Sequence, residues 1–165
     1  MLNIVKNNFL SFIGLESNTT SHAEKLVSVL GGFIGIFMVT LISGYFVDQQ
    51  SAALLVASMG ASAVLVFGVP HGSLSQPWQL IGGHLVSAVI GVTVAKWLHG
   101  TLIPGALAVA LAIGAMRYLR CVHPPGGATA LAAVVGGPAV HALGYSYVLT
   151  PVLLKPVRSA TRISI

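Results

Sequence analysis

The chain has 165 residues, of which 55% are hydrophobic and only 7% are charged, with 8 Lys and Arg against 3 Asp and Glu. A soluble domain carries about 25% charged residues, so this composition excludes an ordinary soluble enzyme, a disordered chain and a DNA-binding domain. The single cysteine, Cys121, excludes an intramolecular disulfide and a CxxC metal site. The composition therefore predicts an integral membrane protein that contacts the lipid bilayer and binds no nucleic acid.

The chain begins with a polar, mixed segment, residues 1–24, in which we expect neither a signal peptide nor a transit peptide. At its end, Ser21 and Glu24 have the spacing of a capping box, which predicts the start of a helix. The first apolar span, residues 26–47, contains no charge and is long enough to cross about 30 Å of hydrocarbon. Asp48 ends it.

Three more apolar segments follow, separated by residues that break helices. Residues 51–69 form a second uncharged run, and Pro70 to Ser73 interrupt it. Pro77 predicts the first turn of the next helix, which we expect to extend through residues 80–98. Another span is predicted from Pro104 to about Tyr118.

The last part of the chain is apolar but strongly interrupted. Residues 126–135 are too short to cross a bilayer, and a break at 136–138 separates them from a final apolar stretch, residues 140–154. The basic C-terminal segment, residues 155–165, is expected to be aqueous. We therefore divide the chain into a polar N-terminal segment, a transmembrane domain over residues 25–154 and a basic tail.

A short internal repeat organises the transmembrane domain. Residues 60–64 and 127–131 match in residue type at an offset of 67, which predicts two copies of one unit, residues 26–98 and 102–154. If both middle segments cross the membrane, each unit has three spans and the copies are inverted; if both are re-entrant, the copies are parallel. We predict an all-α integral membrane bundle with four to six membrane segments and broken or re-entrant half-helices, and the topology stays open.

The segment 117–129 carries the strongest chemical signal. Pro124 and Pro125 fix the entry into the next helix, and the N–H groups of Gly126 and Gly127 are then left unpaired at a helix start. Such a terminus binds anions, and the nearby cationic side chains would deepen the positive potential. The alternative is that the arginines are interfacial anchors and the prolines form a turn. The predicted anion-binding residues in this segment are Arg117, Arg120, His123, Gly126, Gly127 and Thr129.

The first repeat offers a second half for the same site. Small residues from Gly60 to Ala63 would leave room for passage, and the Ser62 hydroxyl, like that of Thr129, would add a donor. His84 follows two glycines in a predicted helix, so we expect it to face protein or water rather than lipid. It is either a pore residue or a packed, hydrogen-bonded histidine.

Several chemistries are disfavoured by what the sequence lacks. The six histidines show no spacing typical of metal ligands, so we expect no metal and no cofactor. No Asp or Glu follows Asp48, which argues against cation transport and against hydrolysis by a carboxylate base. We expect a protein that is not an enzyme.

These motifs resemble the HPP family of small integral membrane proteins. The signature-like segment is 121–130, and residues 60–67, Pro70–His71, Gln76–Pro77 and 82–84 match the family's other motifs in order. The similarity extends over about residues 26–154. Plastid members are implicated in nitrite transport, so the resemblance implies transport of nitrite or a similar small anion.

The sequence departs from the family's pattern at Lys155, where the last apolar stretch is cut short. The final helix is then short, completed by a neighbouring subunit of a homo-oligomer, or accommodated by local thinning of the bilayer. The expected function is passive or proton-coupled permeation of a small monovalent anion, nitrite first, across a bacterial inner membrane. The alternative is a non-transporting membrane assembly or sensor module in which the His-Pro-Pro motif is structural.

Overall fold

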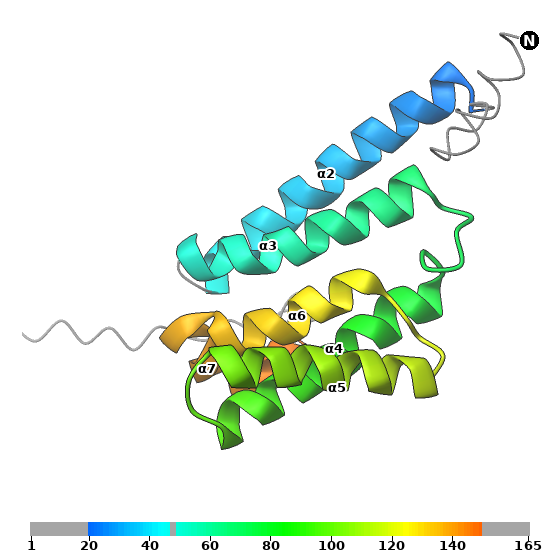
Figure 1. The fold of residues 1–165 in the computed structure, drawn as a ribbon. Helices are drawn as coiled ribbons and strands as arrows, with labels where there is room; N and C mark the ends of the chain where they lie inside the picture. Colours follow the sequence, from blue (N-terminus) through cyan, green and yellow to red (C-terminus); the bar gives the residue numbers. More distant parts are fainter. Residues whose placement is uncertain (1–19, 47–48, 150–165) are drawn as a thin grey trace, which may run out of the picture.

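The computed structural model describes residues 20–46 and 49–149, and within these ranges the chain forms helices and no strands (Figure 1). The described residues form five long helices and three shorter helical segments. They are α2 (His22–Phe46), α3 (Gln49–Ala63), the π-helical turn η1 (Val64–Gly68), α4 (Pro77–Trp97), α5 (Leu102–Tyr118), α6 (Pro124–Val135), α7 (Gly137–Leu143) and the 3₁₀ turn η2 (Gly144–Val148).

The lengths and apolar character of these helices are those of a membrane protein. Two of them, His22–Gly44 and Pro77–Trp97, are long and apolar enough to cross a bilayer. The segments Pro124–Val135 and Gly137–Val148 qualify together as a third span, but the chain bends by 103° at the break between them. The apolar helices Ala52–Gly68 and Leu102–Tyr118 are shorter. The predicted all-helical membrane class is therefore confirmed.

The helices form two packed groups. α4, α5 and α6 contact one another extensively and make the α4–α6 bundle, whose core contains Ala108, Ala112 and Ala130, all with no exposed surface. The α2–α3 hairpin lies beside this bundle and contacts it mainly through α3 against α6 (Figure 1). Such small side chains let helix backbones approach closely, which is how membrane helices gain packing energy.

One glycine shows how closely α4 and α6 pack. A Cβ atom built on Gly91 would lie 2.5 Å from the carbonyl oxygen of Ala130 and 2.8 Å from the Cβ of Ala133. No larger residue fits there without separating the helices.

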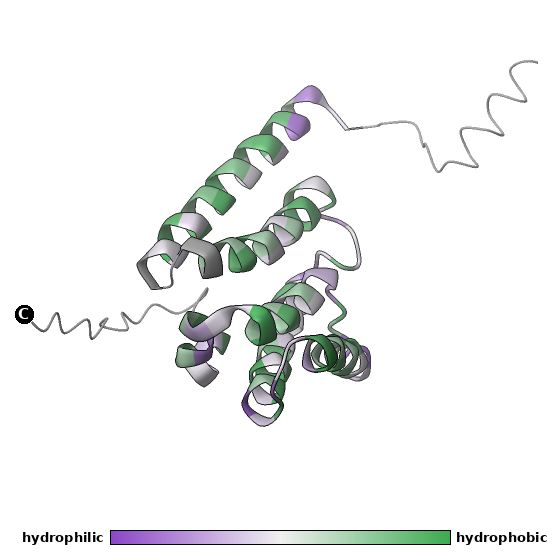
Figure 2. Ribbon diagram, turned by 60° about the vertical axis from the view of Figure 1, so that its left-hand side comes forward, coloured by the Kyte–Doolittle hydropathy of each residue, from purple (hydrophilic) through white to green (hydrophobic). Residues whose placement is uncertain are grey.

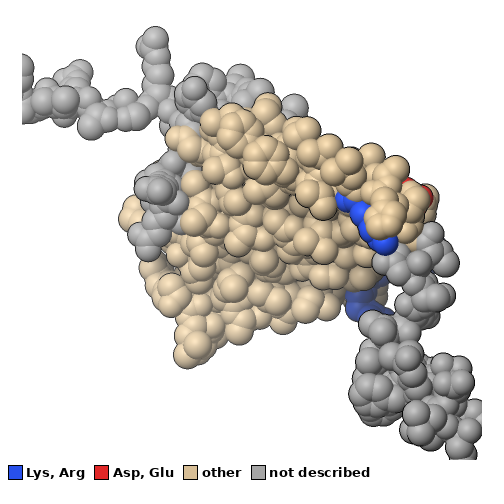
Figure 3. All heavy atoms as spheres, turned by 90° about the horizontal axis from the view of Figure 1, so that it is seen from above, with Lys and Arg blue, Asp and Glu red and all other residues tan. Residues whose placement is uncertain are grey.

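Polar and charged residues gather at the ends of the helices. Figure 2 shows hydrophilic residues at the start of α2, whereas the middle of that helix is apolar. On the face seen in Figure 3, Lys, Arg, Asp and Glu side chains appear only at one end of the molecule. The broad uncharged surface between the ends suits contact with lipid.

The predicted helix starts are confirmed with one shift. Ser21 and Glu24 form the capping box: the Ser21 N–H donates to Glu24 Oε2 at 2.7 Å, and the Glu24 N–H donates to Ser21 Oγ at 3.2 Å. Pro77 starts α4 as expected, but α5 starts at Leu102 rather than at Pro104. A proline fits in a first turn because the N–H groups there have no helical partner.

The predicted final apolar stretch, residues 140–154, is described only as far as residue 149, and this part is helical in two pieces. α7 ends at Leu143, and Gly144 adopts φ 51° and ψ −134°, which ends the α-helix before the 3₁₀ turn. Each predicted repeat unit contains a long helix, a small-residue segment, a break and further helix, and the duplication itself stays a prediction. Asp48, the N-terminal segment before residue 20 and the tail 155–165 lie outside the described residues.

Candidate functional site: a buried histidine–hydroxyl cluster

Five polar side chains from three helices form a hydrogen-bonded group that we call the polar cluster: Ser58, Ser62, His84, His123 and Thr129. Ser62 Oγ lies 2.8 Å from His84 Nε2 and 3.0 Å from His123 Nε2, so one hydroxyl joins two imidazoles. His84 Nδ1 lies 2.8 Å from Thr129 Oγ1, and the two rings meet edge to face with centroids 5.0 Å apart.

The serines are brought to the cluster by the periodicity of α3. Among residues 52–63 of this helix, the buried ones are Ala52, Leu55, Ser58 and Ser62, and their spacing places them on one face. Ser58 Oγ donates to the Leu55 carbonyl at 2.9 Å, and Thr129 Oγ1 lies 3.4 Å from Ser58 Oγ. The face that α3 presents to α6 is therefore polar where the cluster lies.

The π-helical turn η1 and the following loop supply a backbone acceptor. Ser75 Oγ donates to the Leu65 carbonyl at 2.8 Å, which ties the loop back to η1. The neighbouring carbonyl of Leu74 accepts a hydrogen bond from His123 Nδ1 at 2.9 Å. Short π-helical segments of this kind occur often at functional sites.

His123 is held in place by its sequence neighbours. It precedes Pro124 and takes the extended conformation, φ −135° and ψ 108°, that a following proline favours. Gly83 on α4 lets it approach, because a Cβ there would lie only 2.5 Å from His123 Cβ. The side chain is fully buried, and this burial lowers the pKa of His123, an effect that the hydrogen bond donated to the Leu74 carbonyl partly opposes.

The carbonyl of Leu74 determines where the protons of the neutral cluster lie. Because a carbonyl only accepts, His123 Nδ1 carries the proton, and His123 Nε2 must accept from the Ser62 hydroxyl. Ser62 then accepts from His84 Nε2–H. His84 Nδ1 is left as an acceptor for the Thr129 hydroxyl, so the hydrogen bonds point in one direction through the cluster.

The cluster is largely buried, and its hydrogen bonds are satisfied. Ser58, Ser62, His123 and Thr129 are each at most 5% exposed, and His84 is half-buried. Among the described residues, every buried side-chain N or O atom has a hydrogen-bond partner. The serines belong to the α2–α3 hairpin and the other members to α4 and α6, so the cluster lies at the contact between the two packed groups.

The structure brings together four of the predicted site residues: Ser62, His84, His123 and Thr129. Hydrogen-bonded partners among them are up to 61 positions apart in the sequence. Ser62 and Thr129, which occupy equivalent positions in the predicted repeat, both contact His84. Arg117 and Arg120 are exposed at the end of α5 and the turn after it.

The predicted glycines play different parts. The Gly126 N–H donates to the His123 carbonyl at 2.9 Å, so it is already bonded in this structure. Gly127 lines an apolar hollow of about 570 Å³ between α5 and α6. Gly60 lines another hollow, between α2 and α3. Pro124 and Pro125 form the first turn of α6, as the structural part of the motif predicts.

Two participants were not singled out from the sequence. Leu74 acts through its carbonyl, which no side-chain pattern can reveal. Tyr147, from the 3₁₀ turn, is 2% exposed and donates its hydroxyl to the Thr129 carbonyl at 2.9 Å. A buried tyrosine near the end of an apolar segment is a weak signal for such a contact.

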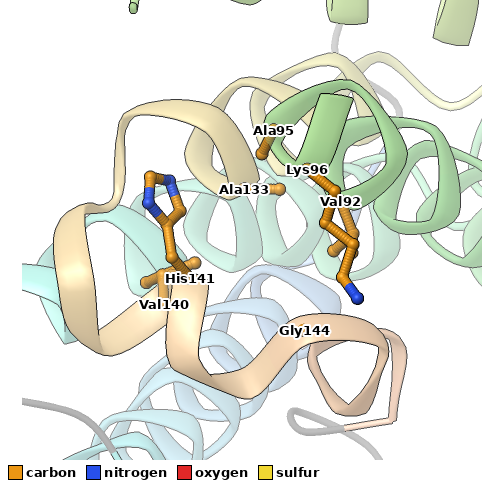
Figure 4. A pocket seen from close by; sticks show the side chains of 7 residues that line it. All are labelled: Val92, Ala95, Lys96, Ala133, Val140, His141 and Gly144. Atoms are coloured by element: carbon orange, nitrogen blue, oxygen red, sulfur yellow. The ribbon is translucent and has the colours of Figure 1, made fainter. Parts of the chain in front are cut away.

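A smaller hollow, of about 90 Å³, lies between the end of α4 and the α7–η2 segment (Figure 4). Lys96 and His141 line it from these two elements. The Lys96 ammonium lies 4.9 Å from the centroid of the Tyr145 ring, and His141 Nε2 donates to the Val134 carbonyl at 2.9 Å. This histidine is thus hydrogen-bonded outside the polar cluster.

No group of three or more His, Cys, Asp or Glu that could hold a metal ion occurs within the described ranges. The cluster offers imidazole nitrogens and hydroxyls without any carboxylate, because residues 49–149 contain neither Asp nor Glu. Its chemistry is that of neutral donors and of groups that gain positive charge on protonation.

The apolar helices and the buried polar centre define an α-helical integral membrane protein. The chain matches the family described as "HPP, transmembrane region" over residues 17–160, and it belongs to this family. It is also similar to two transmembrane proteins of Dictyostelium discoideum, with 40% identity over 129 residues and 39% over 128 residues. These alignments cover 76% and 75% of this chain but 41% and 45% of the relatives, so the chain spans less than half their length. No solved structure matches it.

Proposed function

We propose that this protein moves a small monovalent anion, nitrite first, across a membrane, and that the anion crosses at the polar cluster. The observation that carries the proposal is the Ser62 hydroxyl held between His84 and His123 in an interior without carboxylates. Hydroxyl and imidazole N–H donors can replace part of an anion's hydration, which offsets the cost of bringing charge into an apolar interior.

The position of the cluster supports a route through the contact between the hairpin and the bundle. Ser58 and Ser62 move with α3, whereas His84 and Thr129 belong to α4 and α6. A shift of the α2–α3 hairpin against the α4–α6 bundle would therefore open the cluster to water. Rocking of one helix group against another is a common route to alternating access.

Exposed cations would draw the anion towards one end of this route. Arg117 and Arg120 lie at the end of α5 and in the turn that leads to His123. Gly126 lets α6 lie close to α4, because a Cβ there would lie 2.7 Å from Ser87 Oγ and 2.9 Å from the Gly83 carbonyl oxygen, whereas Gly60 and Gly127 line hollows. We also propose a bacterial inner membrane as the location of the protein and a homo-oligomer as its assembly.

The alternative is a non-transporting assembly or sensor module. It is favoured by the complete hydrogen bonding of the buried side chains in the described residues, because such a network also serves to lock three helices together. In that case the cluster would stabilise the fold and no solute would pass.

Nitrite influx into proteoliposomes tests the proposal. Nitrous acid, the neutral protonated form of nitrite, crosses bare lipid, so empty vesicles serve as the control at each pH from about 5.5 to 8. We expect influx above that of empty vesicles, and His123→Ala is expected to reduce it at least tenfold. Equal influx with and without protein would refute transport. If influx is protein-dependent but unchanged in both His123→Ala and Arg120→Ala, the site is elsewhere.

A further inference from the structure

The polar cluster has places for one proton more than its neutral form holds. In that form His84 Nδ1 accepts from the Thr129 hydroxyl. When a proton attaches to His84 Nδ1, the Thr129 hydroxyl can turn to the Pro125 carbonyl, 3.3 Å away, and its oxygen then accepts from His84. The hydrogen bonds that join Thr129, His84, Ser62, His123 and the Leu74 carbonyl are all still made after this single rotation.

The added proton can also lie on His123, in an arrangement that makes the same number of hydrogen bonds. His84 Nε2 can pass its proton to Ser62 Oγ while Ser62 passes its own proton to His123 Nε2, over distances of 2.8 and 3.0 Å. One proton leaves His84, one arrives at His123, and the Ser62 hydroxyl stays neutral. The positive charge moves from one ring to the other without any movement of the helices.

A second added proton is opposed by charge. Two imidazolium rings would stand with their centroids 5.0 Å apart. The elements packed around the cluster (α3, the loop after η1, α4, α6 and η2) contain no carboxylate that would neutralise them. Other titratable groups close by are the Tyr147 phenol, which bonds to the Thr129 carbonyl, and the Cys121 thiol beside Gly82. Both are neutral near pH 7.

We propose that His84 and His123 share one proton through Ser62, and that each anion crosses together with this proton, as an electroneutral one-to-one symport. The inference rests on the proposed anion transport and adds its coupling ion and stoichiometry. A protonated cluster carries a single positive charge, which a monovalent anion neutralises. Binding of the anion and of the proton must then strengthen each other by the same factor.

Proteoliposomes that contain the whole chain and a trapped pH-sensitive dye test the stoichiometry. Nitrite influx above that of empty vesicles should acidify the lumen by one proton per nitrite. A membrane potential imposed with valinomycin and potassium should leave the rate of this influx unchanged. A uniporter would instead change its nitrite accumulation about tenfold for each 59 mV. Influx that depends on the protein and follows the potential without protons would overturn the symport but keep the proposed function. No protein-dependent influx would overturn the proposed function itself.

His84→Gln tests the role of the cluster, because glutamine can hydrogen-bond to Ser62 but cannot hold the proton. We expect nitrite influx to fall at least tenfold and the remaining flux to lose its protons. His141→Gln removes a histidine outside the cluster and should keep the wild-type rate and stoichiometry. A one-to-one proton movement retained in His84→Gln would overturn the inference.

Nitrogen-15 NMR of histidine-labelled protein keeps the inference testable where a variant fails to fold. At neutral pH, His84 should carry its proton on Nε2 and His123 on Nδ1. Nitrite and acid together should add one proton to the pair. Independent titration of both rings to the doubly charged form would contradict proton sharing.

Discussion

Replacing Gly83 by alanine tests how packing on α4 positions the polar cluster. The new Cβ would lie 2.5 Å from His123 Cβ and 3.0 Å from the Cys121 carbonyl oxygen. Carbon atoms in contact lie about 3.5–4.0 Å apart, so His123 must retreat by about 1 Å. The distance from Ser62 Oγ to His123 Nε2, now 3.0 Å, would then exceed hydrogen-bond range.

The cost of this change can be assembled from its parts. Overpacking costs about 2 kcal/mol and the lost buried hydrogen bond about 1 kcal/mol, whereas alanine gains about 1 kcal/mol in a helix. The net loss of about 2 kcal/mol should lower the melting temperature in detergent by about 4–8 °C. The control is Gly114→Ala on α5, where nothing lies within 4 Å of the new Cβ. A Gly83→Ala protein that melts like wild type, with an unchanged NMR signal from His123, would refute this account of the packing.

Three further predictions concern the turn between α5 and α6. Arg120 has φ 55°, a left-handed conformation that costs a non-glycine residue about 1 kcal/mol. Arg120→Gly should therefore raise the melting temperature, whereas the control Arg117→Gly, within α5, should lower it. Burial raises the pKa of the Cys121 thiol, so a maleimide should label this thiol at pH 7 only when the protein unfolds. As a control, the thiol introduced by Ser73→Cys at an exposed site should react at once. Burial lowers the pKa of His123 below its ordinary 6.5, so the unfolded chain binds more protons. The stability of the folded protein should therefore fall as the pH drops below about 6.5. Melting curves at several pH values check this expectation, and His123→Gln should lack the part of the pH dependence that His123 causes.

The sequence was sufficient to predict the class of fold and most helix starts, because these depend on local signals. The membrane class follows from the charge-free runs. The helix starts follow from features within one or two turns, such as the capping box at Ser21 and the proline at position 77. Pro124 likewise predicts both the start of α6 and the extended conformation of His123 before it.

Long-range contacts decide the parts that sequence could not supply. Ser62 and His123 were both predicted site residues, yet the hydroxyl bridge between the rings depends on how α3 packs against α6. The Leu74 carbonyl orders the protons of the cluster, and a backbone atom leaves no mark in a residue pattern. The predicted free N–H of Gly126 is bonded to His123 because the first turn of α6 closes on itself.

The end of the fold shows the same limit. The apolar composition of residues 140–149 does not reveal that Gly144 takes a left-handed conformation that ends α7. The choice between a continuous helix and a turn depends on the contacts around that glycine.

Removal of one hydroxyl tests the central claim most directly. Ser62→Ala deletes the hydroxyl that joins His84 and His123, whereas Ser87→Ala deletes an equally buried hydroxyl whose partner is the Met116 sulfur, 3.7 Å away. In nitrite influx measurements on proteoliposomes, the protein-dependent rate should fall at least tenfold in Ser62→Ala. Ser87→Ala should keep the wild-type rate. Equal influx through the two variants, with both folded, would contradict the claim that the anion crosses at the polar cluster.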